Sequence, residues 1–321
     1  MKTFLTTSLL LAITGAAMAQ NPDKALSRVS YSFTHVQDTT QRDKPHRENM
    51  LLVIGKNASV YTSYDKINKN IAMQKQLQEQ IKNQAGSGGT MSLKLEGTSI
   101  TKVSEVDYFY FANEQKLVTK ERIFNNYLIE EAAPKIAWKI AKDTASFVGI
   151  KCQRATAYFK GRNWTAWFAP ELPFQSGPWK LNGLPGLIIE AYDDKKEVLF
   201  QFAGMENVIQ QETQAAADAE PKIATPNGSL NIVNIMGMDS GSPYLGNEIK
   251  LPADAVKTTQ KELDKLKDAR AKDPQGFMQA QMAGSGMNVS VKSTQTGSIS
   301  TAAPLASKNV INNPIELPEK K

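Results

Sequence analysis

Cys152, His35 and His46 are the side chains of this sequence best suited to nucleophilic or acid–base chemistry. A cysteine nucleophile needs a histidine nearby as its base, and the chain contains one cysteine and two histidines. Alternation along "GIKCQRATAYF" places Cys152 on one face of a strand, which favours a buried, inert thiol over a reactive one. A single cysteine also excludes a disulfide within the chain.

The two histidines lie in different settings. His35 ends a run of apolar residues spaced two apart in "RVSYSFTH", so we expect it to pack at the end of a strand. His46 lies among charged residues in "QRDKPHREN", where we expect a loop. The sequence has no H-E-x-x-H or G-x-S-x-G motif and too few ligands for an ordinary zinc site, so the common hydrolase mechanisms find little support.

Methionine sulfur offers a second kind of chemistry. Met236 and Met238 flank a glycine, and Met278 and Met282 are four residues apart, on one face of a helix if it forms. Thioethers are soft ligands that favour Cu(I), although methionine is also common filler on apolar faces. A soft-metal or redox function that uses Cys152 or these methionines is the alternative hypothesis, and we assign no metal site and no cofactor.

Four carboxylates lie near one another in the sequence. Glu171 lies between prolines in "PELP", and Glu190, Asp193 and Asp194 lie further along the chain. A hydrolase with paired carboxylates needs two of them within about 5–10 Å across a cleft. Turn chemistry and surface ion pairs account for these residues, so we assign no catalytic residue.

The beginning of the chain predicts export. "MKTFLTTSLLLAITGAAMAQ" has a lysine, an apolar run and the small-x-small pattern of Ala17 to Ala19, which is typical of a signal peptide over residues 1–19. No cysteine follows, so we expect no lipid anchor, and no later segment has the ~20 apolar residues of a membrane span. We therefore expect a periplasmic or secreted protein.

The charge pattern gives no sign of a nucleic-acid partner. The 321 residues carry a net charge of +6, but both signs alternate in "KELDKLKDARAKD". Tracking of phosphates needs basic residues clustered on one face. The pattern therefore indicates a solvated helix.

Short strands dominate residues 20–208. β-branched and aromatic residues recur between turn sequences. The turn sites that we predict are Gly55-Lys56-Asn57, Asn113-Glu114, Asn125-Asn126, Lys160-Gly161 and Asp193-Asp194. The pattern predicts a mainly β (α+β) protein, with a curved antiparallel β-sheet or half-open barrel, a few peripheral helices and long flexible inserts.

The other segments surround or interrupt this core. We predict a helical insert near 63–84, a Gly-rich loop at 85–91, a linker or mobile insert at 209–230, a short strand plus helical segment at 231–284, and a low-complexity tail at 285–321. In the helical segment, Thr259 and Glu262 have the spacing of a capping box, and Pro274 breaks or restarts the helix.

One apolar motif contains no titratable side chain, no hydroxyl and no metal ligand. It consists of Gly183, Leu184, Pro185, Gly186, Leu187 and Ile188. Pro185 and Gly186 suit the second and third positions of a type II β-turn, where glycine adopts positive φ cheaply. We expect a turn that begins a buried strand at Leu187, and a docking site for a peptide or partner is the other interpretation.

The sequence around this motif resembles the GLPGLI family of exported bacterial proteins. The resemblance covers about sixty residues, from Ile136 to Asp194, and contains the whole hexapeptide. The other matching positions are Trp138-Lys139, Gly149, Cys152, Ala155, Gly161-Arg162, Trp164, Ala166-Trp167, Pro170-Glu171, Pro173 and Gly177-Pro178. The resemblance implies an exported protein of a Gram-negative bacterial group with outer-membrane transport systems. It gives no activity, substrate or cofactor to expect here.

The side chains themselves suggest a binding surface. The candidates are Arg162, Trp164, Trp167, Glu171 and Trp179. Alternation puts Trp164 and Trp167 on opposite faces of a strand, so we expect one of them in the core. The other is either structural as well, which we favour, or exposed near Arg154 or Arg162 as a stacking platform. Trp179 is expected to be exposed on a loop. We therefore expect an exported, non-catalytic cell-envelope protein that binds a partner protein or an apolar ligand on a β-sheet surface.

Overall fold

The computed structural model describes residues 22–84, 102–208, 222–225, 228–231, 244–284 and 311–319. The predicted signal peptide, the Gly-rich loop at 85–91 and most of the predicted tail lie outside these residues. So do Met236 and Met238 and the side chains of Met278 and Met282.

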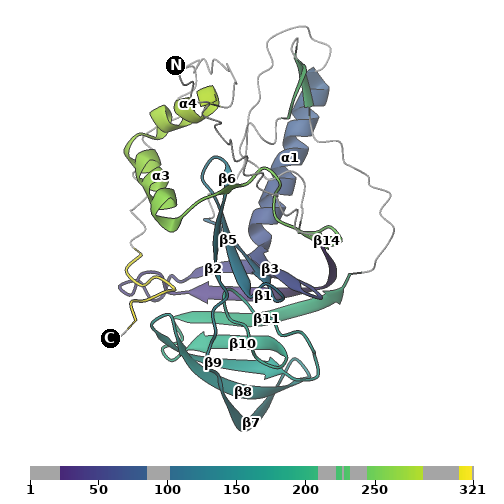
Figure 1. Cartoon of the computed structure of the whole chain (residues 1–321), viewed down its shortest axis with the longest axis vertical. Coiled ribbons are helices and arrows are strands. Elements are labelled where there is room, and N and C mark those ends of the chain that lie inside the picture. Colours follow the sequence, from purple (N-terminus) through teal and green to yellow (C-terminus); the bar gives the residue numbers. More distant parts are fainter. Residues whose placement is uncertain are drawn as a thin grey trace, which may run out of the picture.

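Most of the described chain forms one large, curved and open sheet (Figure 1). Its long strands, in chain order, are β1 (Asp23–His35), β2 (His46–Gly55), β3 (Ala58–Ser63), β4 (Val106–Phe111), β5 (Lys116–Arg122), β6 (Asn126–Ala132), β7 (Lys139–Phe147), β8 (Ile150–Phe159), β9 (Arg162–Ala169), β10 (Leu187–Asp193) and β11 (Val198–Asn207). Two short strands, β14 (Glu248–Ile249) and β15 (Val256–Lys257), pair with β1 and β6. The prediction of a mainly β protein with a curved antiparallel sheet is confirmed.

The strands follow a meander with one long crossover. The order across the sheet is β15-β6-β5-β4-β3-β2-β1-β11-β10-β9-β8-β7. Short turns at the predicted sites join β2 to β3, β4 to β5, β5 to β6, β8 to β9 and β10 to β11. Because β1 pairs with β2 on one side and with β11 on the other, the first and last long strands join the two halves of the sheet.

Alternation along the strands gives the sheet two apolar faces. The inner face carries Tyr31, Leu52 and Phe168 in a core with the aromatic and aliphatic side chains of β8 to β11. The outer face carries Leu51 and Phe109 in a second core. Successive residues of a strand point to opposite faces, so Leu51 and Leu52 on β2 belong to different cores.

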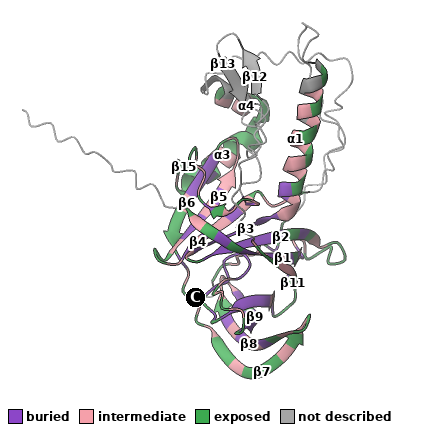
Figure 2. Ribbon diagram, turned by 90° about the vertical axis from the view of Figure 1, so that its right-hand side faces the viewer, coloured by how far each residue is buried: buried purple, intermediate pink, exposed green. Residues whose placement is uncertain are grey.

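A helix, α1 (Tyr64–Gln84), begins at the outer face and extends away from the sheet (Figures 1 and 2). It is anchored by a buried polar network centred on Asp107 of β4. Thr62 Oγ1 and Lys66 Nζ donate to Asp107 Oδ1 at 2.5 and 2.6 Å, and Tyr244 Oη donates to Oδ2 at 2.7 Å. Burial raises the pKa of Asp107, but Lys66 and Lys120 outweigh it and hold the pKa well below its ordinary value.

Two helices follow the sheet in the chain. α3 (Gln260–Lys272) starts at Thr259, whose side chain accepts from the backbone N–H of Glu262, and α4 (Pro274–Gly284) restarts at Pro274. Both features agree with the sequence pattern. No helix in the described part of the chain has the length and apolarity needed to cross a membrane.

Two segments differ from the organisation that the sequence suggested. Residues 222–231 include a small hairpin, β12 (Lys222–Thr225) with β13 (Gly228–Asn231), where a linker was predicted. Residues 311–319, at the end of the predicted low-complexity tail, are held against β1 and the β8–β9 turn. Composition describes how well a segment forms its own core, and it cannot reveal a segment that docks onto another core.

Candidate functional site

The loop of residues 170–186, between β9 and β10, folds across the inner face of the sheet. The backbone N–H of Leu187 donates to the Leu172 carbonyl at 3.1 Å, and that of Ile188 donates to the Ser176 carbonyl at 3.1 Å. These bonds fold the start of the loop back along the start of β10. Tyr31 Oη of β1 donates to the Ile188 carbonyl at 2.6 Å, where a bulge interrupts the pairing of β10 with β9.

Large side chains of the loop fill the inner face. Trp179, Leu181 and Leu184 are buried in the same core as the strands. The Trp179 ring lies 5.6 Å from that of Trp164 and 5.8 Å from that of Phe159, between ring centroids. The exposed position expected for Trp179 is therefore wrong, because the loop turns this side chain inward against two aromatic rings.

Polar contacts hold the far side of the loop to the other half of the sheet. Trp138 Nε1 donates to the Asn182 carbonyl at 2.8 Å. Lys180 Nζ lies 3.1 Å from Glu131 Oε1 of β6 and 5.7 Å from the centre of the Tyr108 ring on β4. The loop thus bridges β9 and β10 to β4 and β6.

The GLPGLI hexapeptide forms the last part of this loop. β10 begins at Leu187, which is fully buried, so the predicted turn into a core strand is confirmed. The predicted type II turn is wrong. The Gly186 N–H donates to the Leu184 carbonyl two residues earlier, at 2.9 Å, which is the bond of a γ-turn centred on Pro185.

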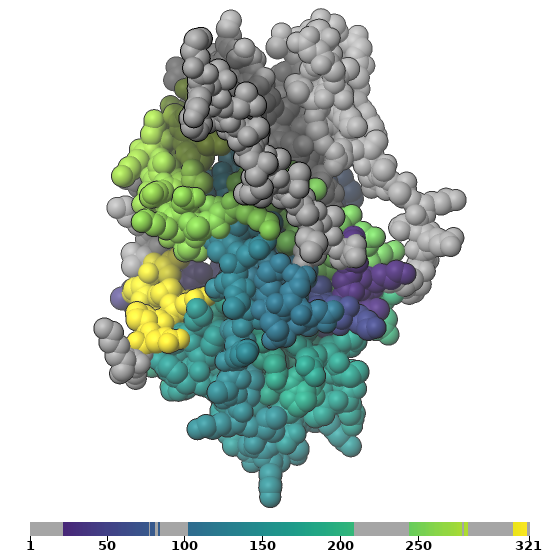
Figure 3. All heavy atoms as spheres, viewed as in Figure 1, coloured from purple at the N-terminus to yellow at the C-terminus, as the bar shows by residue number. Residues whose placement is uncertain are grey.

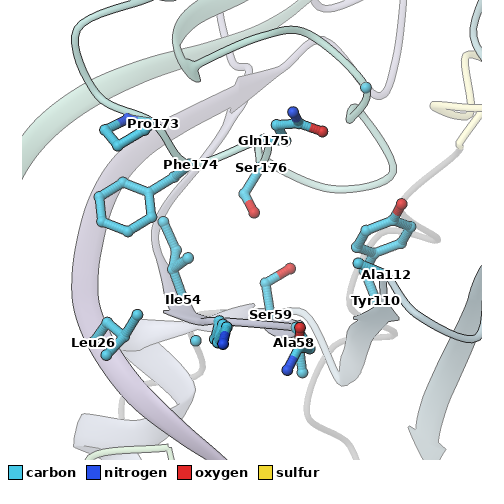
Figure 4. Close-up of a pocket in the computed structure, with 14 residues that line it drawn as sticks. Leu26, Ile54, Ala58, Ser59, Tyr110, Ala112, Pro173, Phe174, Gln175 and Ser176 are labelled. Atoms are coloured by element: carbon cyan, nitrogen blue, oxygen red, sulfur yellow. The ribbon is translucent and has the colours of Figure 1, made fainter.

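Two cavities lie on either side of this loop, at opposite ends of β1 to β4. One, of about 350 Å³, opens between the loop and the β2–β3 turn (Figure 4). There Phe174 lies near Ile54, and Ser176 of the loop faces Ser59 of β3. The other, of about 280 Å³, is lined largely by apolar and aromatic side chains near the His35 end of β1.

A narrow gap beneath the loop lies between the two cavities. It shares Ser59, Tyr110 and Ser176 with the first cavity. It shares Tyr61, Tyr108 and Trp179 with the second cavity. The gap itself has a volume of only about 10 Å³. The inner face therefore carries two cavities in line along the strands, connected only by this constriction, and we call the three together the groove.

Two residues that line the second cavity each carry a buried polar atom that has no hydrogen-bond partner within the described ranges. The atoms are Tyr61 Oη and Trp179 Nε1. Trp179 Nε1 lies beside the Tyr108 hydroxyl but makes no hydrogen bond of good geometry with it. Such atoms cost free energy when buried. They have almost no accessible surface, so a ligand atom reaches them only when a neighbouring side chain shifts.

Burial is the main influence on the two tyrosine hydroxyls near these atoms. It raises the pKa of Tyr61 well above its ordinary value, and Glu48 raises it further. Burial also raises the pKa of Tyr108, with Glu316 acting in the same direction. Glu316 is itself paired with Lys180 at 2.9 Å. Both phenols are therefore neutral.

The predicted binding residues do not form one surface. Trp164 is in the inner core, and Trp167 packs half-buried beside Phe147 with ring centroids 5.5 Å apart. Glu171 is exposed on the loop. Arg162 is buried and lies in an ion pair with Asp193, so it forms no exposed platform with a tryptophan. Of the five candidates, Trp179 lines the second cavity and the gap beside it. The sequence signal for the groove was the alternation that puts tyrosines on the inner face of β3 and β4.

Cys152 is 2% exposed, and burial raises the pKa of its thiol to about 11. The thiolate is the reactive form, so we expect a thiol-reactive dye to label the folded protein slowly and the urea-unfolded protein completely. Rapid stoichiometric labelling of the folded protein would restore the redox hypothesis.

His35 predicts a pH dependence of stability. It is buried as expected, and its Nε2 lies 2.8 Å from the Asn313 carbonyl. Burial, together with nearby Arg162, lowers its pKa to about 4, whereas the unfolded value is about 6.5. As the pH falls from about 6.5 to about 4, the unfolded chain binds this proton and the folded chain does not. The free energy of unfolding should therefore fall by about 2–4 kcal/mol in that range.

Urea midpoints measured at pH values between 7 and 5 test this dependence. His35→Gln keeps a donor for the Asn313 carbonyl and removes the titration, so its midpoints should vary much less. If the urea midpoint changes equally with pH in the wild type and the variant, His35 is not the source of the dependence.

His46 lies in a strand, where a loop was expected. It is the first residue of β2, and its Nε2 lies 2.9 Å from Glu48 Oε2.

Most of the residues that line the groove lie within a range that matches a known family model. Residues 35–190 match the family model described as "Protein of unknown function (Porph_ging)". The matched range includes β2 to β9, the 170–186 loop and the GLPGLI hexapeptide. No curated protein matches the chain.

Two crystal structures of PNGF-II resemble the chain weakly. The structure in space group P21 covers 60% of this chain and 30% of its own, with 8% identity and a TM-score of 0.40. The structure in space group C2 covers 75% of this chain and 32% of its own, with 8% identity and a TM-score of 0.44. The chain thus spans about a third of the length of those proteins. A likeness at this level establishes neither a shared fold nor a shared function.

Proposed function

We propose that this protein binds an elongated apolar molecule in the groove between its sheet and the 170–186 loop. The observation that carries the proposal is the pair of cavities, of about 350 and 280 Å³, with a shared narrow gap between them. Ligand sites in proteins have volumes of about 300–1,000 Å³. At about 3.3 Å per residue, the groove extends on the order of 20 Å along β2, which suits a chain better than a compact ring.

The polar end of the ligand would lie in the second cavity. Tyr61 Oη and Trp179 Nε1 can both donate a hydrogen bond, and neither has a partner among the described residues. Two neutral donors in a largely apolar cavity favour a neutral acceptor, such as an ester or amide carbonyl, because an anion buried there would lose its hydration. We infer that the ligand is a neutral acyl compound, with its chain directed toward Ser59 and the first cavity.

The proposal also places the protein outside the cytoplasm. The sequence pattern of residues 1–19 supports export, and an apolar ligand needs a carrier to cross an aqueous compartment. A partner protein on the sheet surface has less support, because the inner face is occupied by the loop. The soft-metal alternative stays untested, because Met236 and Met238 and the side chains of Met278 and Met282 lie outside the described residues.

Blocking the gap beneath the loop tests the proposal. Ser59 lines both the gap and the first cavity, so Ser59→Leu should obstruct a chain that runs between the cavities. The neutral dye N-phenylnaphthylamine serves as the probe, and monododecanoylglycerol as the competitor. We expect displacement at micromolar concentrations in the wild type, and at concentrations at least tenfold higher in Ser59→Leu.

Ser32→Leu is the matched control, because Ser32 is exposed between the buried Tyr31 and Phe33 on β1 and thus faces away from the groove. It should bind like the wild type, and urea midpoints should confirm that both variants fold. Failure of the wild type to bind the dye or the acylglycerol would refute the proposal, as would equal binding by Ser59→Leu.

A further inference from the structure

Residues 311–319 lie on the molecular surface as an irregular segment with bends at Asn313, Ile315 and Glu316 (Figure 3, yellow). Asn313 N–H donates to the Gln37 carbonyl at 3.1 Å, and Leu317 N–H donates to the Lys160 carbonyl at 3.0 Å. The segment therefore bridges the end of β1 and the β8–β9 turn. In this part of the chain only Asn313 is buried, and no residue is assigned to a strand.

The Asn313 side chain fits a fully polar pocket. Its Nδ2 donates to the Val36 carbonyl at 2.8 Å and to Glu197 Oε2 at 3.0 Å. Its Oδ1 accepts from Arg162 Nη2 at 2.7 Å, and its own carbonyl is bonded by His35. An asparagine amide has two donor hydrogens and one acceptor oxygen, and this pocket satisfies each of them. Aspartate would place a carboxylate against Glu197 and lose both donated bonds.

Arg162 donates hydrogen bonds to the backbone carbonyls of the two residues after Asn313. Its Nη2 also donates to the Pro314 carbonyl at 2.7 Å, and its Nε donates to the Ile315 carbonyl at 2.8 Å. The remaining nitrogen, Nη1, lies 2.7 Å from Asp193 Oδ2, which holds the guanidinium in place. Because proline has no backbone N–H, position 314 has no donor that needs a partner.

The β8–β9 turn lies in close contact with the same segment. Gly161 has φ +74, and a Cβ added there would lie 2.6 Å from the Leu317 Cβ and from its carbonyl oxygen. Lys160 Nζ lies 3.2 Å from Glu316 Oε2. Three consecutive residues, Lys160 to Arg162, thus contact the segment by a salt bridge, a close backbone approach and a fork of hydrogen bonds.

We propose that this surface is an exchangeable peptide-binding site, selective for an asparagine followed by proline, which the chain fills with its own residues 311–317. The segment is held by one buried side chain, by the hydrogen bonds described above, by ion pairs of Glu316 with Lys160 and Lys180, and by the packing of Ile315 against the inner core. None of its described residues belongs to a strand, so its release breaks no strand pairing and leaves the sheet intact. A covalently attached segment competes at high effective concentration. The site would therefore take a free peptide of the same sequence when the chain's own anchor is removed.

Fluorescence anisotropy with a labelled synthetic peptide tests the site. The peptide has the sequence of residues 309–319, NVINNPIELPE. The receptor is the full chain with Asn313→Ala, in which the chain's own segment loses its anchor. We expect this variant to bind the peptide at least tenfold more tightly than the wild type does. A peptide that carries N313D should bind the variant at least tenfold more weakly than the unchanged peptide.

The matched control is Asn312→Ala, because Asn312 is the neighbouring asparagine and its side chain bonds to exposed groups of Asp38 and Thr39. It should bind the peptide as weakly as the wild type. Three results would overturn the inference: no binding to Asn313→Ala at millimolar peptide, equal binding to Asn313→Ala and wild type, or equal binding of the N313D peptide. Ile311, Pro314 and Ile315 of the segment also line the second cavity, so the peptide is measured without any acyl ligand. If the groove proves to bind no acyl ligand, the results expected here stay the same.

Discussion

Replacing Leu187 by alanine should lower the free energy of unfolding by about 2–5 kcal/mol. Leu187 is fully buried at the start of β10, between the 170–186 loop and β9. Its truncation removes apolar contacts and leaves a cavity that a packed strand closes only in part. Urea unfolding should show a lower midpoint at an unchanged slope.

Ile140→Ala is the control for this substitution. Ile140 lies on the outermost strand, β7, and is 50% exposed, so its truncation should cost much less. If Leu187→Ala unfolds at the wild-type midpoint, the hexapeptide does not begin a core strand and is a recognition surface instead.

Gly186→Ala should be nearly as damaging, for a different reason. A Cβ at this position would lie 2.2 Å from the carbonyl oxygen of Ala169 and 3.0 Å from the backbone N of Pro170. Both contacts are with backbone, so relief requires β9 and β10 to move apart. We expect a loss of about 3 kcal/mol or more, at the upper end of what overpacking costs.

Gly183→Ala separates this crowding from backbone strain. Gly183 has φ +86, but no heavy atom lies within 4 Å of the position that a Cβ would take. Its substitution should therefore cost only the left-handed strain of about 1–2 kcal/mol. Pro185→Ala should cost about 0.4–1 kcal/mol, since it mainly frees the unfolded chain. If Gly183→Ala proves as costly as Gly186→Ala, crowding against Ala169 is not the dominant effect.

The strands and their turns could be predicted because their signals are local. The alternation of β1 and the Lys160-Gly161 turn depend on residues within a few positions of each other. The cap of α3 at Thr259 is equally local. The structure agrees with the sequence at all three places.

The groove and the peptide site could not be predicted, because each joins residues that are distant in the chain. Trp179 follows a proline in a loop, and nothing in its neighbours indicates that Trp164 and Phe159 will cover it. Arg162 looks like an exposed strand-end cation, yet its partners are Asp193 and residues 313–315. The requirement for glycine at position 186 was evident, but its cause is contact with another strand.

The binding of neutral acylglycerols of increasing chain length tests the central claim most directly. Each CH₂ that becomes buried contributes about 0.8 kcal/mol, or roughly a fourfold gain in affinity. In the wild type, affinity should rise from octanoyl through dodecanoyl to hexadecanoyl glycerol, as the chain passes beneath the loop. In Ser59→Leu, the rise should stop at the shorter chains, which fit within one cavity. An affinity that is independent of chain length, or a rise that continues equally in both proteins, would contradict a groove that runs through the gap at Ser59.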